Sequence, residues 1–113
     1  MQRLPKRLVE GSQLTAVAAT YYTTPANTIT TISAFSVTNT TVTARAVTVH
    51  LVPSGGAAGP TNCVCPARVV PPGETYNVTG AIGQTMDAGG FISALADAAT
   101  ALTLVASGYQ TNP

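Results

Sequence analysis

The stretch from Thr20 to Val52 reads TYYTTPANTITTISAFSVTNTTVTARAVTVHLV and decides the fold class of this chain. β-Branched residues fill two long runs, about Thr28–Thr38 and Val42–Val52, on either side of a polar turn at residues 39–41. Such residues suit a pleated, half-buried surface better than a helix. The stretch therefore predicts two long strands joined as a β-hairpin.

The two runs differ in how regularly they alternate. In the second run, Val47, Val49 and Leu51 share one side of the strand, which is the period of two expected when one face of a sheet is buried. In the first run the alternation breaks near Ser33. This break predicts a β-bulge or burial on both faces.

The rest of the chain continues the pattern of short strands and turns. Short strands are expected at residues 14–17, 20–23, 67–70 and 75–79, and loops at residues 53–62 and 84–90. The sequence PPGE at Pro71–Glu74 predicts a tight turn. Residues 91–107 fit either a helical stripe or two strands joined near residues 97–100, and the flanking glycines favour the hairpin. About seven to nine strands predict an all-β antiparallel β-sandwich or jelly roll.

Composition limits the partners that the chain can have. Only 8% of its 113 residues are charged, against about 25% in a typical soluble domain, so its surface is either covered by permanent assembly or solvated by threonine hydroxyls. The five basic residues are too few and too scattered for a nucleic-acid interface. Residues 11–44 carry no charge, but their many polar side chains and prolines argue against a membrane-spanning helix. The first ten residues lack the apolar core of a secretory signal.

The chain is expected to divide into an extended N-terminal arm, residues 1–12, and one β-sandwich domain, residues 13–113. Pro5 and the pair Gly11–Ser12 interrupt any regular element in the arm. Such an arm is either a frayed terminus or a segment that docks on a partner. Its apolar and basic side chains form the candidate partner interface: Arg3, Leu4, Lys6, Arg7, Leu8 and Val9.

The groups needed for catalysis or metal binding do not gather anywhere in the sequence. His50 is the single imidazole and lies in mid-strand, while the four carboxylates are spread over expected turns and the arm. We therefore predict no catalytic, cofactor-binding or metal-binding residues and no enzyme activity. Cys63 and Cys65 are expected to stay reduced. The alternatives are a disulfide within or between chains, or a metal ion held with help from His50 or from another chain.

Three tyrosines are possible surface contacts: Tyr21, Tyr22 and Tyr109. Tyrosine combines a large apolar ring with a polar tip and is enriched at interfaces. The alternative is that these rings pack in the core or at the sheet edges.

Several segments are of a type found together in one class of protein. They are Tyr22–Thr28 (YTTPANT), Val37–Asn39 (VTN), Ala44–Pro53 (ARAVTVHLVP), Ser54–Gly56 (SGG) and Pro71–Glu74 (PPGE). With their surroundings, residues 21–109, they resemble the small β-sandwich structural proteins of tailed bacteriophages. The shared segments mark a fold and not a site. Proteins of this kind serve as capsid decoration (cement) proteins, and similar sandwiches occur in neck, tail and head-fibre components.

The resemblance implies a capsid decoration protein that binds the outer surface of the assembled capsid and stabilises the shell. Its partners would be the major capsid protein and, in a homotrimer, other copies of itself, with no nucleic acid and no membrane. Its location would be the exterior of the virion, after synthesis in the cytoplasm of the bacterial host. The alternatives are a neck, tail or head-fibre component, and a glycan-binding virion module that uses the tyrosines and residues 54–61.

Overall fold

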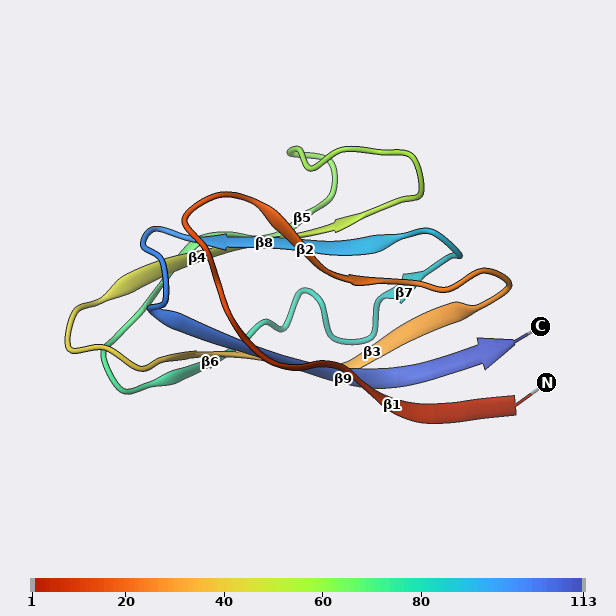
Figure 1. Ribbon diagram of the computed structural model, residues 1–113, viewed down its shortest axis with the longest axis horizontal. Coiled ribbons are helices and arrows are strands. Elements are labelled where there is room, and N and C mark those ends of the chain that lie inside the picture. Colours follow the sequence, from red (N-terminus) through yellow and green to blue (C-terminus); the bar gives the residue numbers. More distant parts are fainter. Residues whose placement is uncertain (1, 113) are drawn as a thin grey trace.

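The computed structural model describes the backbone of residues 2–112 and the side chains of residues 4–111. Within that range the chain forms nine β-strands and no helix. The strands are β1 (Gln2–Gln13), β2 (Ala19–Thr23), β3 (Ile29–Asn39), β4 (Arg45–Val52), β5 (Cys63–Val70), β6 (Thr75–Asn77), β7 (Thr85–Met86), β8 (Phe91–Ala96) and β9 (Leu102–Asn112). None of the described residues belongs to a helix that could cross a membrane. The strands form two layers, and the first and last strands end side by side (Figure 1).

The two layers are antiparallel sheets. The first has the order β1-β9-β3-β6, with β7 pairing β3, and the second has the order β2-β8-β4-β5. The chain is folded back on itself, so that its strands pair in order from the two ends toward the middle: β1 with β9, β2 with β8, β3 with β6, and β4 with β5. Pairing of β9 with β3 and of β8 with β4 then wraps the ribbon into two facing sheets. This is the order of a jelly roll, so the predicted all-β sandwich is confirmed.

Side chains from the two facing sheets make the core. Phe35 and Leu104 from the first sheet, and Val47 and Val49 from the second, are at most 1% exposed. The predicted shared inner face of Val47 and Val49 is confirmed, whereas Leu51 is only half-buried. The core thus lies between the sheets, and neither sheet could bury its apolar face alone.

The predicted irregularity near Ser33 is a β-bulge. The pairing of β3 with β9 shifts just after Ile32, so the inward-facing positions change parity between Ile32 and Phe35. Gly108 lies opposite Ile32, and a Cβ atom at Gly108 would overlap the carbonyl oxygen of Thr31. Only glycine lets β9 approach β3 so closely beside the bulge.

The predicted hairpin between the two long runs is wrong. β3 and β4 are both strands, but they lie in opposite sheets, and residues 40–44 cross the sandwich between them. The strands expected within residues 91–107 likewise exist as β8 and β9, again in opposite sheets. Alternation shows which face of a strand is buried but not which strand it pairs with. Two strands in facing sheets bury their apolar faces just as two hairpin partners do, so the same pattern fits both arrangements.

The tight turn at residues 71–74 is confirmed. The Glu74 N–H donates to the Pro71 carbonyl oxygen at 3.2 Å, and Gly73 has a φ of 72°. Pro72 followed by a residue of positive φ is the pattern of a type II turn, which favours glycine at this position. The turn carries the chain from β5 in one sheet to β6 in the other.

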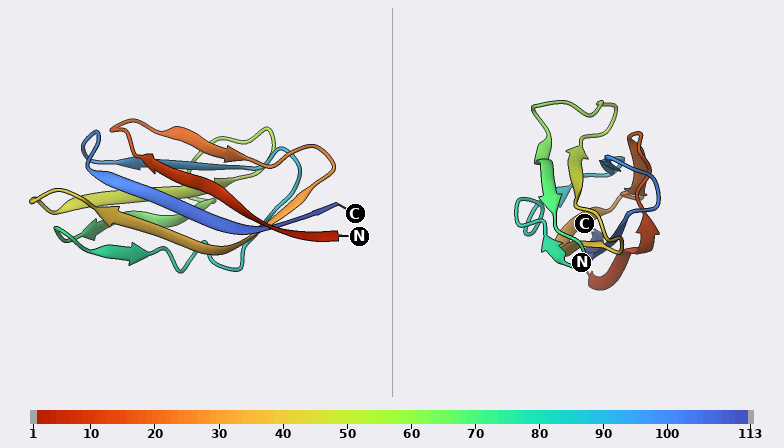
Figure 2. Two further views of the ribbon diagram at one scale, coloured as in Figure 1. Left: turned by 60° about the horizontal axis from the view of Figure 1, so that its bottom comes forward. Right: turned by 90° about the vertical axis from the view of Figure 1, so that its left-hand side faces the viewer.

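The separate N-terminal arm is not confirmed. Residues 2–13 form β1, which pairs with β9 along its length and is an edge strand of the first sheet (Figure 2). Leu8 and Val9 are 7% and 3% exposed and belong to the core. The sequence pattern conceals this strand because its register shifts on both sides of Val9, so that alternation is lost.

Candidate partner-binding groove

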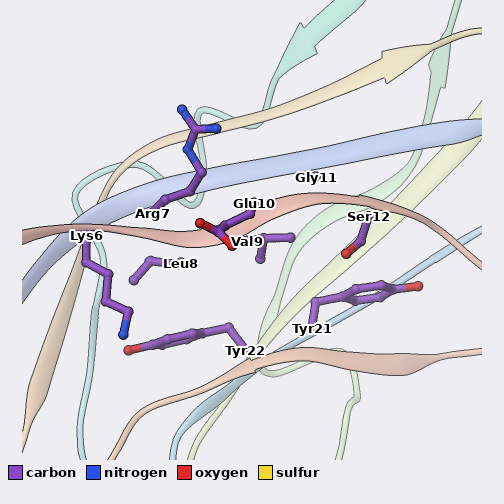
Figure 3. Close-up of a pocket in the computed structure, with 9 residues that line it drawn as sticks. All are labelled: Lys6, Arg7, Leu8, Val9, Glu10, Gly11, Ser12, Tyr21 and Tyr22. Carbon is purple, nitrogen blue, oxygen red and sulfur yellow. The ribbon is translucent and has the colours of Figure 1, made fainter.

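A groove of about 710 Å³ runs between β1 and β2, which are edge strands of the two facing sheets. Its lining residues are Lys6, Arg7, Leu8, Val9, Glu10, Gly11, Ser12, Tyr21 and Tyr22. Figure 3 shows the two tyrosines of β2 on one side of the groove and the side chains of β1 on the other. Most of the arm residues and tyrosines singled out from the sequence therefore meet in one place.

The two tyrosines are held in place by their hydroxyl groups. The Tyr22 hydroxyl accepts a hydrogen bond from Nε2 of Gln110 at 2.7 Å and lies 2.9 Å from the Thr30 hydroxyl. The Tyr21 hydroxyl accepts a hydrogen bond from the Thr15 N–H at 3.2 Å. Both rings are half-buried and pack against the core. Because the hydroxyls already have partners within the chain, the rings offer a ligand mainly apolar surface in fixed positions.

The charged side chains of the groove come from β1 and are exposed. Lys6 extends toward Tyr22, whereas Arg7 points to the opposite side of the strand (Figure 3). Glu10 also projects from β1, next to Val9 and on the far side of the groove from the tyrosines (Figure 3). Lys6 is thus the cation that lies toward the rings, while Arg7 is exposed on the other side of β1.

Two predicted interface residues are not available to a partner. Leu8 and Val9 line the bottom of the groove but are buried in the core of their own chain. Leu4 is 47% exposed and precedes the groove on β1, where it pairs with Gln110 of β9. The side chain of Arg3 lies outside the described side chains.

Tyr109 and residues 54–61, which were also singled out, do not line this groove. Tyr109 pairs with Pro5 of β1 and Thr31 of β3, and borders a second shallow pocket that shares Lys6 and Arg7 with the groove. Residues 54–61 belong to the loop between β4 and β5, at the opposite edge of the second sheet. Sequence reasoning missed Glu10 and Ser12, because nothing in their spacing shows that the double register shift of β1 brings them beside the tyrosines.

The edge of β1 is poorly suited to pairing with a strand from another protein. Pro5 lacks an N–H group, Lys6 and Arg7 are charged, and the register shifts between Arg7 and Val9 and again after Val9. Proline, charge and bulges are the features by which natural sheets keep edge strands from adding further strands. Contact with another molecule at this edge would therefore involve side chains and not extension of the sheet.

His50 lies within β4, opposite Ser93 of β8 and Cys63 of β5. Among the described side chains, no three of the types His, Cys, Asp and Glu are grouped so that they could hold a metal ion. The residues that line the groove include one carboxylate, two cationic side chains and two tyrosine rings.

The two cysteines are free and differ in their surroundings. Cys65 pairs with the buried Val49 and is itself 3% exposed, while Cys63 pairs with His50 and is half-buried. Burial raises the pKa of the Cys65 thiol and outweighs the backbone hydrogen bond of Arg68, which lowers it; the Cys63 charge adds a smaller increase and the Arg68 charge a smaller decrease. The thiolate is the reactive form, so Cys65 is doubly protected.

We expect the native protein to react with one equivalent of a thiol reagent such as dithionitrobenzoate at pH 8, and with two after unfolding. The Cys63→Ser variant should react only when unfolded, because its remaining thiol is buried and has a raised pKa. The Cys65→Ser variant should keep the fast native reaction. If the folded Cys63→Ser and Cys65→Ser variants reacted with the reagent at equal rates, Cys63 would not be the more accessible thiol.

Comparisons with protein-family models, curated proteins and solved structures found no match to this chain. Its function is therefore inferred from its own sequence, its fold and the groove.

Proposed function

We propose that this chain is a bacteriophage capsid decoration protein, which binds the outside of the assembled shell and stabilises it. The resemblance of residues 21–109 to small phage sandwiches supports this proposal. So does the jelly-roll order of the strands, an architecture that also builds viral capsid domains. Because one fold can serve many functions, the groove between β1 and β2 carries the proposal.

The observation that carries the proposal is that fixed tyrosine rings lie beside the exposed cationic side chain of Lys6 in this groove. Tyr21 and Tyr22 are held by internal hydrogen bonds, so binding does not have to immobilise them. Lys6 is exposed beside Tyr22, and Arg7 is exposed on the other side of β1. A protein surface with apolar contacts and carboxylates fits this combination, and aromatic and arginine side chains are typical of protein interfaces.

The mechanism of such a protein is thermodynamic. A ligand that binds the assembled shell and not its separated parts stabilises the assembly by mass action. In a homotrimer, three weak contacts act together and gain affinity because the second and third contacts form within one complex. The partners in this mechanism are the major capsid protein and two further copies of the chain.

The double variant Lys6→Gln/Arg7→Gln is expected to bind purified expanded shells about tenfold more weakly, because two charge contacts at the edge of the interface are removed. Co-sedimentation with shells at low and high salt measures this effect. Arg68→Gln is the matched control: it also removes a positive charge, but its guanidinium lies 4.7 Å from the centre of the Tyr76 ring, on β6, away from the groove. If the double variant and the wild type bind shells equally at low salt, the groove is not part of the interface.

Two rival functions have their own tests. Cryo-electron microscopy of the virion that shows this chain only at the portal vertex or tail would make it a neck or tail component. The nearness of Glu10 and Ser12 to the tyrosines favours a glycan-binding module as a second function. A glycan array on which Tyr21→Ala removes binding would support that module in place of the shell contact.

A further inference from the structure

His50 and Cys63 face each other on neighbouring strands of the second sheet. His50 lies on β4 and pairs with Cys63 of β5, which is the edge strand of that sheet. The side chains of such an antiparallel pair project from the same face, with Cβ atoms about 4.5–5.5 Å apart. Both residues are half-buried, and the Cys63 thiol is free. The sheet therefore places a thiol and an imidazole side by side.

A β-bulge in β5 produces this pairing. Val49 pairs with Cys65 and His50 pairs with Cys63, so β5 advances by two residues where β4 advances by one. In a regular strand Cys63 and Cys65 would share a face, because they are two residues apart. The bulge instead separates them, so that Cys65 is buried in the core while Cys63 lies beside His50. The Cys-x-Cys spacing thus conceals a Cys–His pair, which depends on the register of β4 and β5.

The pair borders a hollow of about 520 Å³ at the surface. Its other lining residues are Gly59 and Pro60, from the loop between β4 and β5, and Pro66 of β5. Glycine and proline have no side-chain donor, acceptor or charge. The thiol and the imidazole are therefore the only side chains lining this hollow that can bind a metal ion. Among the described side chains they are not part of any group of three or more metal-binding residues.

Two ligands of this kind suit Cu(I) better than other biological metal ions. Thiolate sulfur and imidazole nitrogen favour copper and zinc, whereas Mg²⁺ and Ca²⁺ require oxygen ligands. Structural zinc sites have four protein ligands. Cu(I) is a soft ion that forms stable complexes with only two ligands, one on each side of the metal. A Cys–His pair in neighbouring strands has this arrangement, with room for one ion between the two side chains.

We propose that Cys63 and His50 form a Cu(I) site, in which one ion joins the Cys63 sulfur to a ring nitrogen of His50. On binding, the thiol gives its proton to water and the copper keeps its oxidation state. The ion joins β4 to β5 at the two ends of the loop of residues 53–62, so it stabilises the folded chain. This inference is independent of the proposed function, and it replaces the expectation that these two residues bind no metal.

The test is an anaerobic titration of the reduced chain with Cu(I), in competition with the chelator bicinchoninate. We expect one Cu(I) per chain, a copper–thiolate absorption band in the near ultraviolet, and a melting temperature raised by roughly 5 °C or more. Cys63→Ser should lose the band and bind about a hundredfold more weakly, and His50→Gln about tenfold more weakly. Cys65→Ala is the matched control, because it removes the other thiol of β5 without placing a polar group in the core. It should bind within about threefold of the wild type.

Several results would overturn the site. Copper binding by Cys63→Ser or His50→Gln that equals the wild type would show that the pair does not hold the ion. Loss of binding in Cys65→Ala, with the fold intact by circular dichroism, would assign the copper to the buried thiol. One ion shared by two chains, with a dimer in size-exclusion chromatography, would show that a single pair is insufficient. Zn²⁺ that binds as tightly as Cu(I) would require further ligands, because two fill only half of its tetrahedral shell.

Discussion

A chain that lacks residues 2–10 is expected to lose its stable fold. This deletion removes most of β1, including Leu8 and Val9, which are 7% and 3% exposed in the core. Burial of two such side chains is worth about 3–6 kcal/mol, a large part of the roughly 5–15 kcal/mol that stabilises a typical domain. The deletion also leaves β9 as a long unprotected edge, which favours aggregation.

Circular dichroism melting and size-exclusion chromatography measure this effect. We expect the melting temperature to fall by roughly 15 °C or more, with soluble aggregates or precipitate. Deletion of residues 2–5 is the control, because it keeps the buried pair and should leave the sandwich folded. Val9→Asp should reproduce most of the loss without shortening the chain. A shortened chain, without residues 2–10, that melts within a few degrees of the full chain would show that β1 is a dispensable arm after all.

The contrast between an arm and a strand shows what the sequence could and could not predict. Strands were predictable wherever alternation was regular, as at Val47 and Val49, and even the bulge at Ser33 could be found from its break in parity. β1 could not be found in this way, because Leu8 and Val9 are neighbours that are both buried. A pattern with a period of two does not describe a strand that contains two register shifts.

The arrangement of strands into sheets was the second limit. Residues 39–41 have the composition of a hairpin turn, and so do residues 97–100, but each begins a crossing between the sheets. Local composition determines that the chain turns, whereas the pairing of β1 with β9 and of β3 with β9 depends on contacts far apart in sequence.

The candidate groove was predictable only in part. Residue type alone is enough to select the candidate contact residues Tyr21, Tyr22, Lys6 and Arg7. They line one groove, however, only because β1 and β2 are edge strands of facing sheets.

Asn39→Asp is expected to destabilise the protein strongly at neutral pH and much less at acidic pH. The wild-type side chain is fully buried, and Nδ2 donates to the carbonyl oxygens of Thr43 and Val70, each at 2.9 Å. Its Oδ1 accepts two hydrogen bonds from Thr41. The side chain thus satisfies all four of its hydrogen-bonding positions while it joins the ends of β3 and β5 to the crossing loop.

An aspartate there has nearly the same shape but places a second oxygen against two carbonyl oxygens. Loss of two hydrogen bonds and burial of a charge cost about 3–5 kcal/mol when the carboxylate is ionised. Protonation restores one donor, so the folded protein binds the proton more tightly and the pKa of the new carboxyl lies above the value of about 3.9 in the unfolded chain. Stability of this variant is therefore greatest below that unfolded value and falls as the pH rises through the raised folded pKa.

Guanidinium unfolding of the variant and the wild type between pH 4 and pH 8 measures the difference. Asn77→Asp, an exposed change of the same chemistry on β6, is the control and should differ from the wild type by less than about 0.5 kcal/mol across this range. If the free energy of unfolding depends strongly on pH only in Asn39→Asp, the wild-type Nδ2 is a buried donor that faces two carbonyl oxygens. The same pH profile for both variants would mean that residue 39 is open to water, and other contacts would then hold the loop between β3 and β4.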